Sequence, residues 1–275
     1  MWRQFILFAN CSSSSISNKQ QTTKMAEVSS VIEFNVNMTC GNCENSIRDS
    51  LSKLQGITSV TINIQQQQVI VTTTYPSEVV QKAIESTGML AIVKGQGLDI
   101  SNHMGAAISI LKRNQRTLGL VRFTQITEET CVIDGSFNGL NAGKYGLHIH
   151  QFGDLSSFCE STGDDYNPTE NCHGDRENTS RHAGDMGNVE VGEKGSAVFR
   201  YQDNMIKVWD IIGRSVVLHE KEDDFSNDPH GNAGKGLACG IIARSAGLFQ
   251  NKKMVCSCSG KTIWQEREDA KNEMG

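Results

Sequence analysis

The sequence predicts a multidomain chain: an α+β domain of βαββαβ order, then an all-β barrel, then a flexible C-terminal tail. Three observations predict it. From 31 to 95 the hydrophobic pattern alternates between strand and helix periods, whereas from 106 onward only short strand-like runs separated by turn residues occur. The chain of 275 residues also has room for about two domains of 100–200 residues each.

Composition excludes several classes of function. A hydrophobic content of 37%, a charged content of 21% and a net charge of −5 suit a soluble globular protein and argue against binding to nucleic acid or to an anionic membrane. No apolar run reaches the roughly 18 residues that a membrane span needs. The nine cysteines are unevenly spread, which favours metal or redox chemistry in a reducing compartment over a secreted disulfide scaffold. We therefore expect a cytoplasmic protein.

The N-terminal extension, 1–30, differs from the rest of the chain. Its short apolar start is followed by a serine-rich run, and no acidic residue occurs before Glu27. This composition faintly resembles a transit peptide, so a minor mitochondrial fraction is a second expectation. The simpler interpretation is a disordered extension, with Met25 as an alternative start.

The expected elements of the first domain follow from the spacing of apolar residues and the positions of glycine and proline. Apolar residues at helical spacing (Ile47, Leu51, Leu54) predict a helix that Gly56 ends, and a Pro-Ser-Glu sequence at 76–78 opens a second helix. The expected elements are strands over 31–38, 58–64, 69–74 and 90–93 and helices over 42–54 and 76–85.

The remaining segments are predicted from turn residues and length. The glycine-containing run 94–97 indicates a linker. A strand-poor stretch over 153–187 is too long for an ordinary turn, and loops of that length are usually functional. After Ala246 the chain becomes polar, as in a flexible tail. The predicted boundaries are 1–30 for the extension, 31–95 for the first domain, 96–245 for the barrel and 246–275 for the tail.

A thiol motif follows the first strand. Cys40 and Cys43 form a C-x-x-C pair preceded by Met38, and soft thiolates select Cu(I) or zinc. Cys43 is expected at the start of a helix, where the helix dipole lowers a thiol's pKa, and Met38 is expected to pack under the loop. A zinc half-site and a redox dithiol remain alternatives. The M-x-C-x-x-C motif in a βαββαβ unit resembles the heavy-metal-associated domain, which implies a ferredoxin-like fold that binds copper.

The centre of the chain resembles Cu,Zn superoxide dismutase over roughly 99–245. The match is clearest in the segments 146–154, 181–189 and 211–221, and is completed by 231–240. The resemblance implies an all-β Greek-key barrel. It also implies copper-ligand positions at His148, His150 and His219, zinc-ligand positions at His173, His182 and Asp185, a carboxylate linking the two sites at Asp223, and a disulfide between Cys159 and Cys239.

Two positions depart from that enzyme family. Asp165 stands where the family has the imidazole that bridges copper and zinc; a carboxylate can complete a zinc site but cannot supply an imidazolate bridge. Gly236 stands where the family has the arginine that guides superoxide to copper, and the neighbouring Lys235 does not hold a guanidinium's geometry. We expect dismutation to be compromised while the barrel and its zinc site remain.

The tail carries a second thiol pair, Cys256 and Cys258. Thiols separated by one residue form a strained, exchangeable disulfide and also a donor pair for Cu(I). The three segments together resemble the family of copper chaperones for superoxide dismutase beyond Ser30. This resemblance implies a metallochaperone rather than an enzyme. It would take Cu(I) at Cys40 and Cys43, hold Zn(II) in its barrel, and dock on Cu,Zn superoxide dismutase as a heterodimer. Its tail, through Cys256 and Cys258, would help to deliver the copper ion and form the target's disulfide. A homodimer of the chain is a further expectation.

Two other functions fit parts of the sequence. The histidines at 148, 150 and 219 would allow an active superoxide dismutase with an appended copper-loading domain, because they form a second candidate copper site. A protein that only buffers copper, with the barrel as a dimerisation scaffold, would bind copper without changing a copper-free target.

Overall fold

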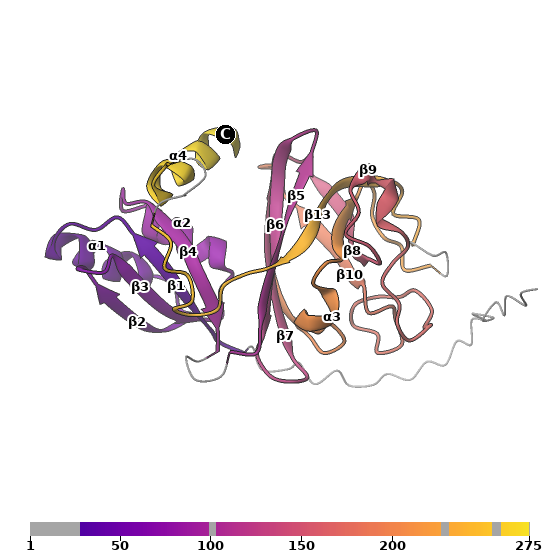
Figure 1. Ribbon diagram of the computed structural model, residues 1–275, viewed down its shortest axis with the longest axis horizontal. Helices are drawn as coiled ribbons and strands as arrows, with labels where there is room; N and C mark the ends of the chain where they lie inside the picture. The colour runs from indigo at the N-terminus through magenta and orange to yellow at the C-terminus, as the bar shows by residue number, and fades with distance from the viewer. Residues whose placement is uncertain (1–27, 99–102, 227–230, 255–259, 275) are drawn as a thin grey trace, which may run out of the picture.

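The computed structural model describes residues 28–98, 103–226, 231–254 and 260–274, and Figure 1 shows a small α+β domain beside a larger β-barrel. The small domain consists of β1 (Ser30–Val36), α1 (Gly41–Ser52), β2 (Ile57–Asn63), β3 (Gln68–Thr73), α2 (Ser77–Glu85) and β4 (Ala91–Gly97). The predicted βαββαβ order is confirmed, and apart from β4 the element ends agree with expectation within two residues.

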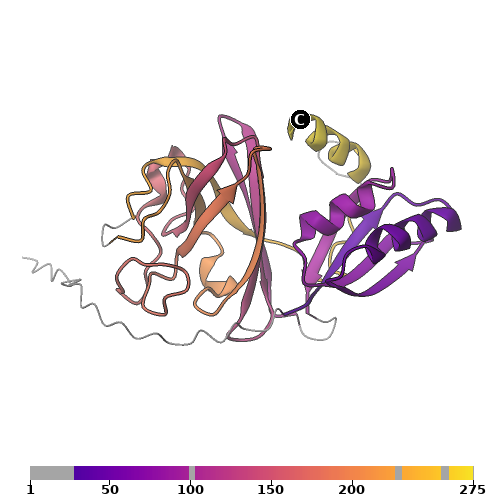
Figure 2. The same ribbon diagram turned by 180° about the vertical axis from the view of Figure 1, so that it is seen from behind.

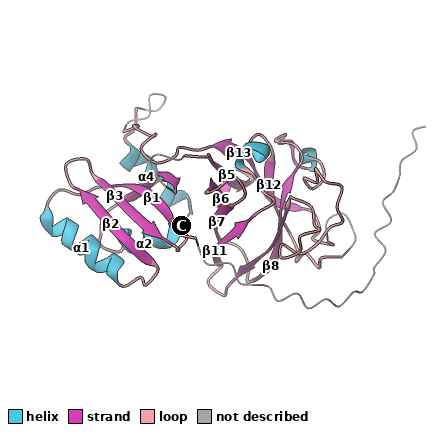
Figure 3. Ribbon diagram, turned by 90° about the horizontal axis from the view of Figure 1, so that it is seen from below, coloured by secondary structure: helices cyan, strands magenta, loops and turns pink. Residues whose placement is uncertain are grey.

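The small domain is a four-stranded antiparallel sheet in the order β2-β3-β1-β4, with both helices packed on one of its faces (Figure 3). Helix residues at i and i+4, such as Ile47 with Leu51 and Val80 with Ile84, are fully buried against Phe34 of the central strand β1. The apolar residues at helical spacing therefore form the helix faces that pack into the core of the domain.

The run 94–97 is not a linker, which corrects that expectation. It continues β4, where Gly95 pairs with Glu33 and Gly97 with Val31 of β1. A Cβ atom on Gly95 would clash with the backbone of Gly247, so this glycine allows the tail to approach the strand closely. The glycines indicated a loop, but at Gly95 the missing side chain instead allows a distant segment to pack closely.

The barrel is one eight-stranded antiparallel sheet in the order β10-β8-β12-β13-β5-β6-β7-β11, with its two edge strands approaching each other. A continuous core of aliphatic and aromatic side chains from all eight strands fills the interior. The strands are β5 (Ala106–Arg113), β6 (Arg116–Gln125), β7 (Cys131–Asn138), β8 (Gly143–His150), β10 (Asp185–Val191), β11 (Ser196–Asp203), β12 (Ser215–His219) and β13 (Gly236–Arg244).

The long strand-poor stretch between β8 and β10 carries only β9 (Ser156–Cys159) and a 3-10 turn over Glu160–Thr162 before it runs as an irregular loop to β10. The short helix α3 (Val208–Ile211) precedes β12. Backbone bonds from Tyr166 to Ile149 (2.7 Å) and from Gly184 to Tyr166 (2.8 Å) attach the irregular loop to the end of β8. Residues from this loop are thereby held next to β8 although they are distant in sequence.

The small domain docks on strands β6 and β7 of the barrel through α2 and β4 (Figures 1 and 2). The contact is polar and buried. Asp134 of β7, which is 2% exposed, accepts hydrogen bonds from Ser77 (2.6 Å) and Gln96 (3.4 Å), and Arg200 of β11 donates to Ser30 (3.1 Å). Because a buried carboxylate costs free energy unless it is bonded, Asp134 favours the docked arrangement.

The C-terminal segment, expected to be flexible, contains helix α4 (Ile263–Met274). Thr262 and Gln265 form a capping box, in which the Gln265 amide donates to the Thr262 hydroxyl (3.3 Å) and the Thr262 amide donates to the Gln265 side chain (2.9 Å). Arg267 and Lys271 then pair with Glu85 at the end of α2 (3.1 and 3.0 Å). The helix is therefore attached to the small domain, as Figure 2 shows from behind.

Two sequence predictions concern residues that are not described. The extension up to residue 27 and the thiols of Cys256 and Cys258 lie outside the described residues. Among the helices that are described, none is long and apolar enough to cross a membrane.

Candidate metal sites

The first candidate site is the thiol pair at the tip of the small domain. Cys40 caps the N-terminus of α1 and Cys43 lies in its first turn, and their sulfur atoms are 3.6 Å apart. Cys40 is exposed, whereas Met38 is buried in the core under the loop, as predicted. Two thiols at this distance on an accessible loop can bind one soft ion and release it to another thiol.

The surrounding loop stabilises the thiolate form of Cys43. Hydrogen bonds from the backbone of Thr39 and Cys40, together with their side chains, lower the pKa of the Cys43 thiol from its ordinary value of 9.0 to about 7. The sequence predicted this direction from the helix dipole, and the backbone contacts of the loop are the main cause. The ligand is therefore available at neutral pH.

The second candidate site lies inside the barrel, where β8 and β12 bring histidines together. His148 and His150 lie on β8, and His219 ends the neighbouring strand β12. Their ring nitrogens, with a carboxylate oxygen of Asp165, lie within 4.8 Å of one another. The Nδ1 atom of His150 bonds the Gly163 carbonyl (2.7 Å), and the Nδ1 atom of His219 bonds the Gly234 carbonyl (2.9 Å). These bonds leave the Nε2 atoms facing inward.

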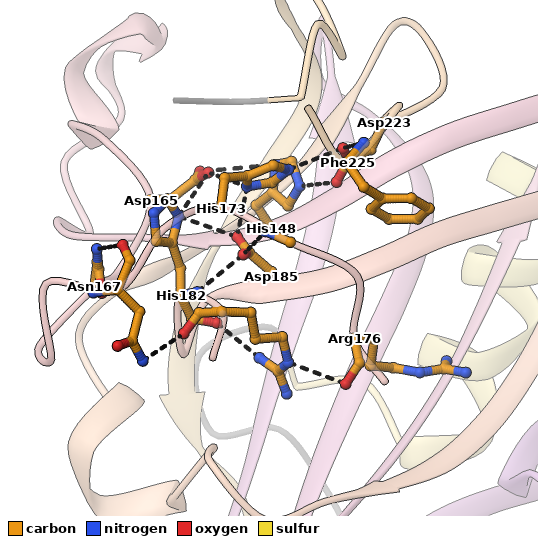
Figure 4. A network of polar contacts seen from close by, with 12 residues as sticks. His148, Asp165, Asn167, His173, Arg176, His182, Asp185, Asp223 and Phe225 are labelled. Carbon is orange, nitrogen blue, oxygen red and sulfur yellow. Dashed lines mark hydrogen bonds and ion pairs between the residues drawn. The ribbon is translucent and has the colours of Figure 1, made fainter. Parts of the chain in front are cut away.

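The third candidate site uses the loop before β10. His173 Nδ1 and His182 Nδ1 approach Asp185 Oδ1 at 3.1 and 3.2 Å (Figure 4). The second Asp185 oxygen accepts the backbone amides of Gly174 and His182, which orients this carboxylate. Two imidazoles and a carboxylate are a ligand set that zinc accepts.

Asp223 joins the two sites from behind, as the sequence predicted. Its two oxygens bond His148 Nε2 and His173 Nε2, each at 2.9 Å (Figure 4). Each of these rings therefore turns its Nδ1 atom toward the interior. The buried Nδ1 atom of His148 has no hydrogen-bond partner among the described residues, so a metal ion fits the donors present.

The two sites differ in protonation. Burial alone would lower the pKa of His173, but hydrogen bonds to Asp185 and Asp223 outweigh it and raise the pKa to about 10. Burial also opposes protonation of His182, but Asp165 and Asp185 raise its pKa to about 9. Burial, with His148 nearby, lowers the pKa of His219 to about 3. Without metal, two protons therefore occupy the zinc-type site, and His219 is neutral.

Binding of zinc at this site would release protons. A zinc ion needs neutral imidazoles, so at pH 7 it should displace about two protons, one from His173 and one from His182. The release should fall toward zero, and the affinity rise, as the pH increases through about 9 to 10. Calorimetry in buffers of different ionisation enthalpy measures the release, in a quadruple-serine variant that lacks the thiols of Cys40, Cys43, Cys256 and Cys258.

The matched control for proton release is His182→Asn, which should reduce it to about one proton per ion. A release near zero at pH 7 in the unsubstituted site would show that the histidines are already neutral and that the acidic partners do not hold the protons.

A buried ion pair that the sequence analysis did not assign supports the zinc-type site. Arg181, 2% exposed, pairs with Asp203 of β11 and donates to the carbonyls of Arg176 (3.1 Å) and His182 (2.8 Å). The arginine lies next to a predicted ligand in a matched sequence segment, but its partner is 22 residues away. Only the fold identifies it as the anchor of this loop.

Cys159 and Cys239 are brought together as expected. Both are buried free thiols that pack with Val217. A hydrogen bond between them raises the pKa of Cys159 and lowers that of Cys239, so the two thiols titrate as a coupled pair. The structure holds the reduced pair, and the disulfide remains a prediction.

Comparisons with known proteins agree with these domains. Residues 33–89 match the heavy-metal-associated domain family, and residues 117–242 match the family Copper/zinc superoxide dismutase (SODC). "Copper chaperone for superoxide dismutase" from Sus scrofa is 49% identical over 88% of this chain and 90% of its own length. The chain belongs to the family of copper chaperones for superoxide dismutase.

Other members of the chaperone family confirm the extent of the match. The human protein of the same name is 47% identical over 86% of this chain and 88% of its own length. "Superoxide dismutase 1 copper chaperone" from Saccharomyces cerevisiae is 31% identical over 86% of this chain and 94% of its own length. The resemblance expected from the sequence and the predicted fold class are thereby confirmed, and copper binding is a property of this family.

Proposed function

We propose that this protein takes up Cu(I) at Cys40 and Cys43 and delivers it to Cu,Zn superoxide dismutase, the target that the names of its relatives give. The observation that carries the proposal is the accessible thiol pair, with sulfur atoms 3.6 Å apart on a domain docked to a dismutase-like barrel. Exposed thiolates bind Cu(I) and exchange it with incoming thiolates.

An exposed apolar patch on the barrel supports docking of a target subunit. It lies on β5, β13 and the two loops beside them, whereas the small domain contacts β6 and β7. A bond from the Gly213 amide to the Ile242 carbonyl (2.9 Å) brings the loop before β12 to β13. The patch consists of Ile110 (47% exposed), Phe152 (56%), Ile212 (41%) and Ile241 (44%). Exposed apolar side chains gathered on neighbouring segments suit a protein interface, and a heterodimer or a homodimer would cover them.

The tail supplies the second half of the proposal. One thiolate of the target attacks the Cys256–Cys258 disulfide to form a mixed disulfide, and the second target thiolate then displaces the tail cysteine. The target gains its disulfide and the tail becomes a dithiol, so two electrons and two protons pass from target to tail. Both tail cysteines lie outside the described residues, and this step rests on the C-x-C spacing.

The test mixes the Cu(I)-loaded protein with copper-free, disulfide-reduced superoxide dismutase in the presence of a copper chelator. Dismutase activity should appear in the mixture and stay absent from the loaded protein alone. The variant with Cys256→Ser and Cys258→Ser should bind Cu(I) and fail to activate the target. Full activation by that variant would contradict the role of the tail.

Charge in the apolar patch should prevent docking. Ile241→Glu places a carboxylate in the patch and should weaken the complex with superoxide dismutase by at least tenfold, because a buried unpaired charge is costly. Val198→Glu is the matched control, since Val198 is 40% exposed but lies on β11 at the far edge of the sheet. Analytical ultracentrifugation of the mixture measures both, and equal weakening by the two variants would place the interface elsewhere.

The second candidate function is superoxide dismutation by this protein itself, favoured by the convergence of His148, His150 and His219. One contact opposes it. A side chain at Gly236 would clash with Cys159, so this position has no room for the arginine expected of the enzyme. Substantial activity of the metal-loaded protein without target would support the enzyme instead.

A further inference from the structure

The carboxylate of Asp165 has a position that copper transfer between thiols does not use. Asp165 is 3% exposed and lies beside His173 and His182 in the barrel (Figure 4). An isolated β-bridge to His150, together with the bond from Tyr166 to the Ile149 carbonyl, ties its backbone to β8. The sequence offered it as a fourth zinc ligand that could not bridge two metals as an imidazole does.

Each oxygen of this carboxylate faces a different set. Asp165 Oδ1 lies 3.3 Å from His150 Nε2 and 3.7 Å from His148 Nδ1. Asp165 Oδ2 lies 3.7 Å from His182 Nδ1 and 3.8 Å from His173 Nδ1. Asp165 is a member of two groups of potential metal ligands, one with His148, His150 and His219 and the other with His148, His173 and Asp185.

In His148, His150 and His173, the nitrogen that faces Asp165 lies opposite a contact that fixes the orientation of the ring. Asp223 occupies the far nitrogens of His148 and His173, and backbone carbonyls occupy those of His150 and His219. Such outer contacts fix the ring orientation and the tautomer of metal-binding histidines. The interior thus presents two imidazole sets on opposite sides of one carboxylate.

We propose that Asp165 bridges two divalent ions, so that the barrel binds a second zinc ion at His148, His150 and His219 beside the ion at His173, His182 and Asp185. Three imidazoles and a carboxylate oxygen suit zinc. Cu(I) prefers soft thiolates, and a hard anionic oxygen in the set discriminates against it. The histidine set is then a divalent site, and the cargo copper stays on the cysteines.

The shared carboxylate also predicts which of the two sites binds an ion first. The set with Asp185 has two carboxylates, whereas the set with His219 has only the shared oxygen of Asp165 to balance a divalent charge. The first ion should therefore bind at His173, His182 and Asp185, and the second should depend more strongly on Asp165.

The experiment titrates Co²⁺, a spectroscopic substitute for zinc, into the full-length quadruple-serine variant. Two ions per chain are expected, with visible bands typical of nitrogen and oxygen ligands and without thiolate charge-transfer bands. Asp165→Asn should lose the second ion and keep the first, and His219→Ala should do the same. Asp165→His is the matched control, because an imidazole at this position can again bridge, and it should keep two ions.

A second measurement does not depend on any barrel variant folding. With two Co²⁺ ions bound, a shared carboxylate should couple their electron spins and weaken the electron paramagnetic resonance signal relative to the one-ion form. A single ion per barrel, two ions without spin coupling, or two ions retained in folded Asp165→Asn would each overturn the bridge. The inference is independent of copper delivery, since the experiment counts ions and contains no target enzyme.

Discussion

Replacing Asp203 with alanine will lower the free energy of unfolding by about 3–5 kcal/mol, because it leaves the buried guanidinium of Arg181 without its anion. Arg181 also donates to the His182 carbonyl, so the loop that carries His182 and Asp185 should loosen at the same time. Urea unfolding measures the first effect, and the rate at which a chelator removes zinc measures the second.

The control for Asp203→Ala is Asp210→Ala, an exposed aspartate on α3. It should change the free energy of unfolding by less than about 0.5 kcal/mol, as most surface substitutions do. If Asp203→Ala were as mild as this control, the ion pair would not be what holds the loop.

Replacing both Cys40 and Cys43 with serine should abolish capture of Cu(I) by the small domain and hence activation of superoxide dismutase. Hydroxyl groups are not soft ligands for Cu(I). In the unsubstituted protein, Cys43 must lose its proton to bind, so its contribution to Cu(I) affinity should fall as the pH drops below about 7 and level off above it. Competition with a chromogenic Cu(I) chelator measures the affinity across pH.

Ser46→Ala is the control for the cysteine pair, because Ser46 is exposed on the same helix and its hydroxyl donates to the Asn42 carbonyl in its own turn. It should leave Cu(I) affinity and its pH profile unchanged. A profile with no step near pH 7 would contradict the stabilisation of the Cys43 thiolate by the loop.

Two substitutions near the candidate metal sites explain why we expect weak dismutase activity. Asp165 removes the bridging imidazole, and Gly236 leaves no room for a guiding arginine beside Cys159. His148, His150 and His219 nonetheless bring their ring nitrogens within 4.8 Å of one another, which is why we propose a divalent ion there. A divalent ion held by imidazoles and carboxylates would stay separate from a Cu(I) cargo held by thiolates.

Much of the fold and of the candidate sites could be predicted because the signals are local. Helical spacing of Ile47 and Leu51 predicted a buried face, and Met38, Cys40 and Cys43 predicted a thiol loop at the start of that helix. The capping box of Thr262 and Gln265 was an equally local signal for α4 and could have predicted that helix.

The amino-acid sequence by itself determined which residues can act as ligands, which segments become strands or helices, and to which family the chain belongs, since these depend on residue type and on periods of two or 3.6 residues. Only the tertiary structure decided that the 94–97 run is strand rather than linker, that Arg181 pairs with Asp203, and that Asp165 turns one oxygen to each histidine set. These features arise where segments distant in sequence meet, and no local period encodes which side chains will face each other there.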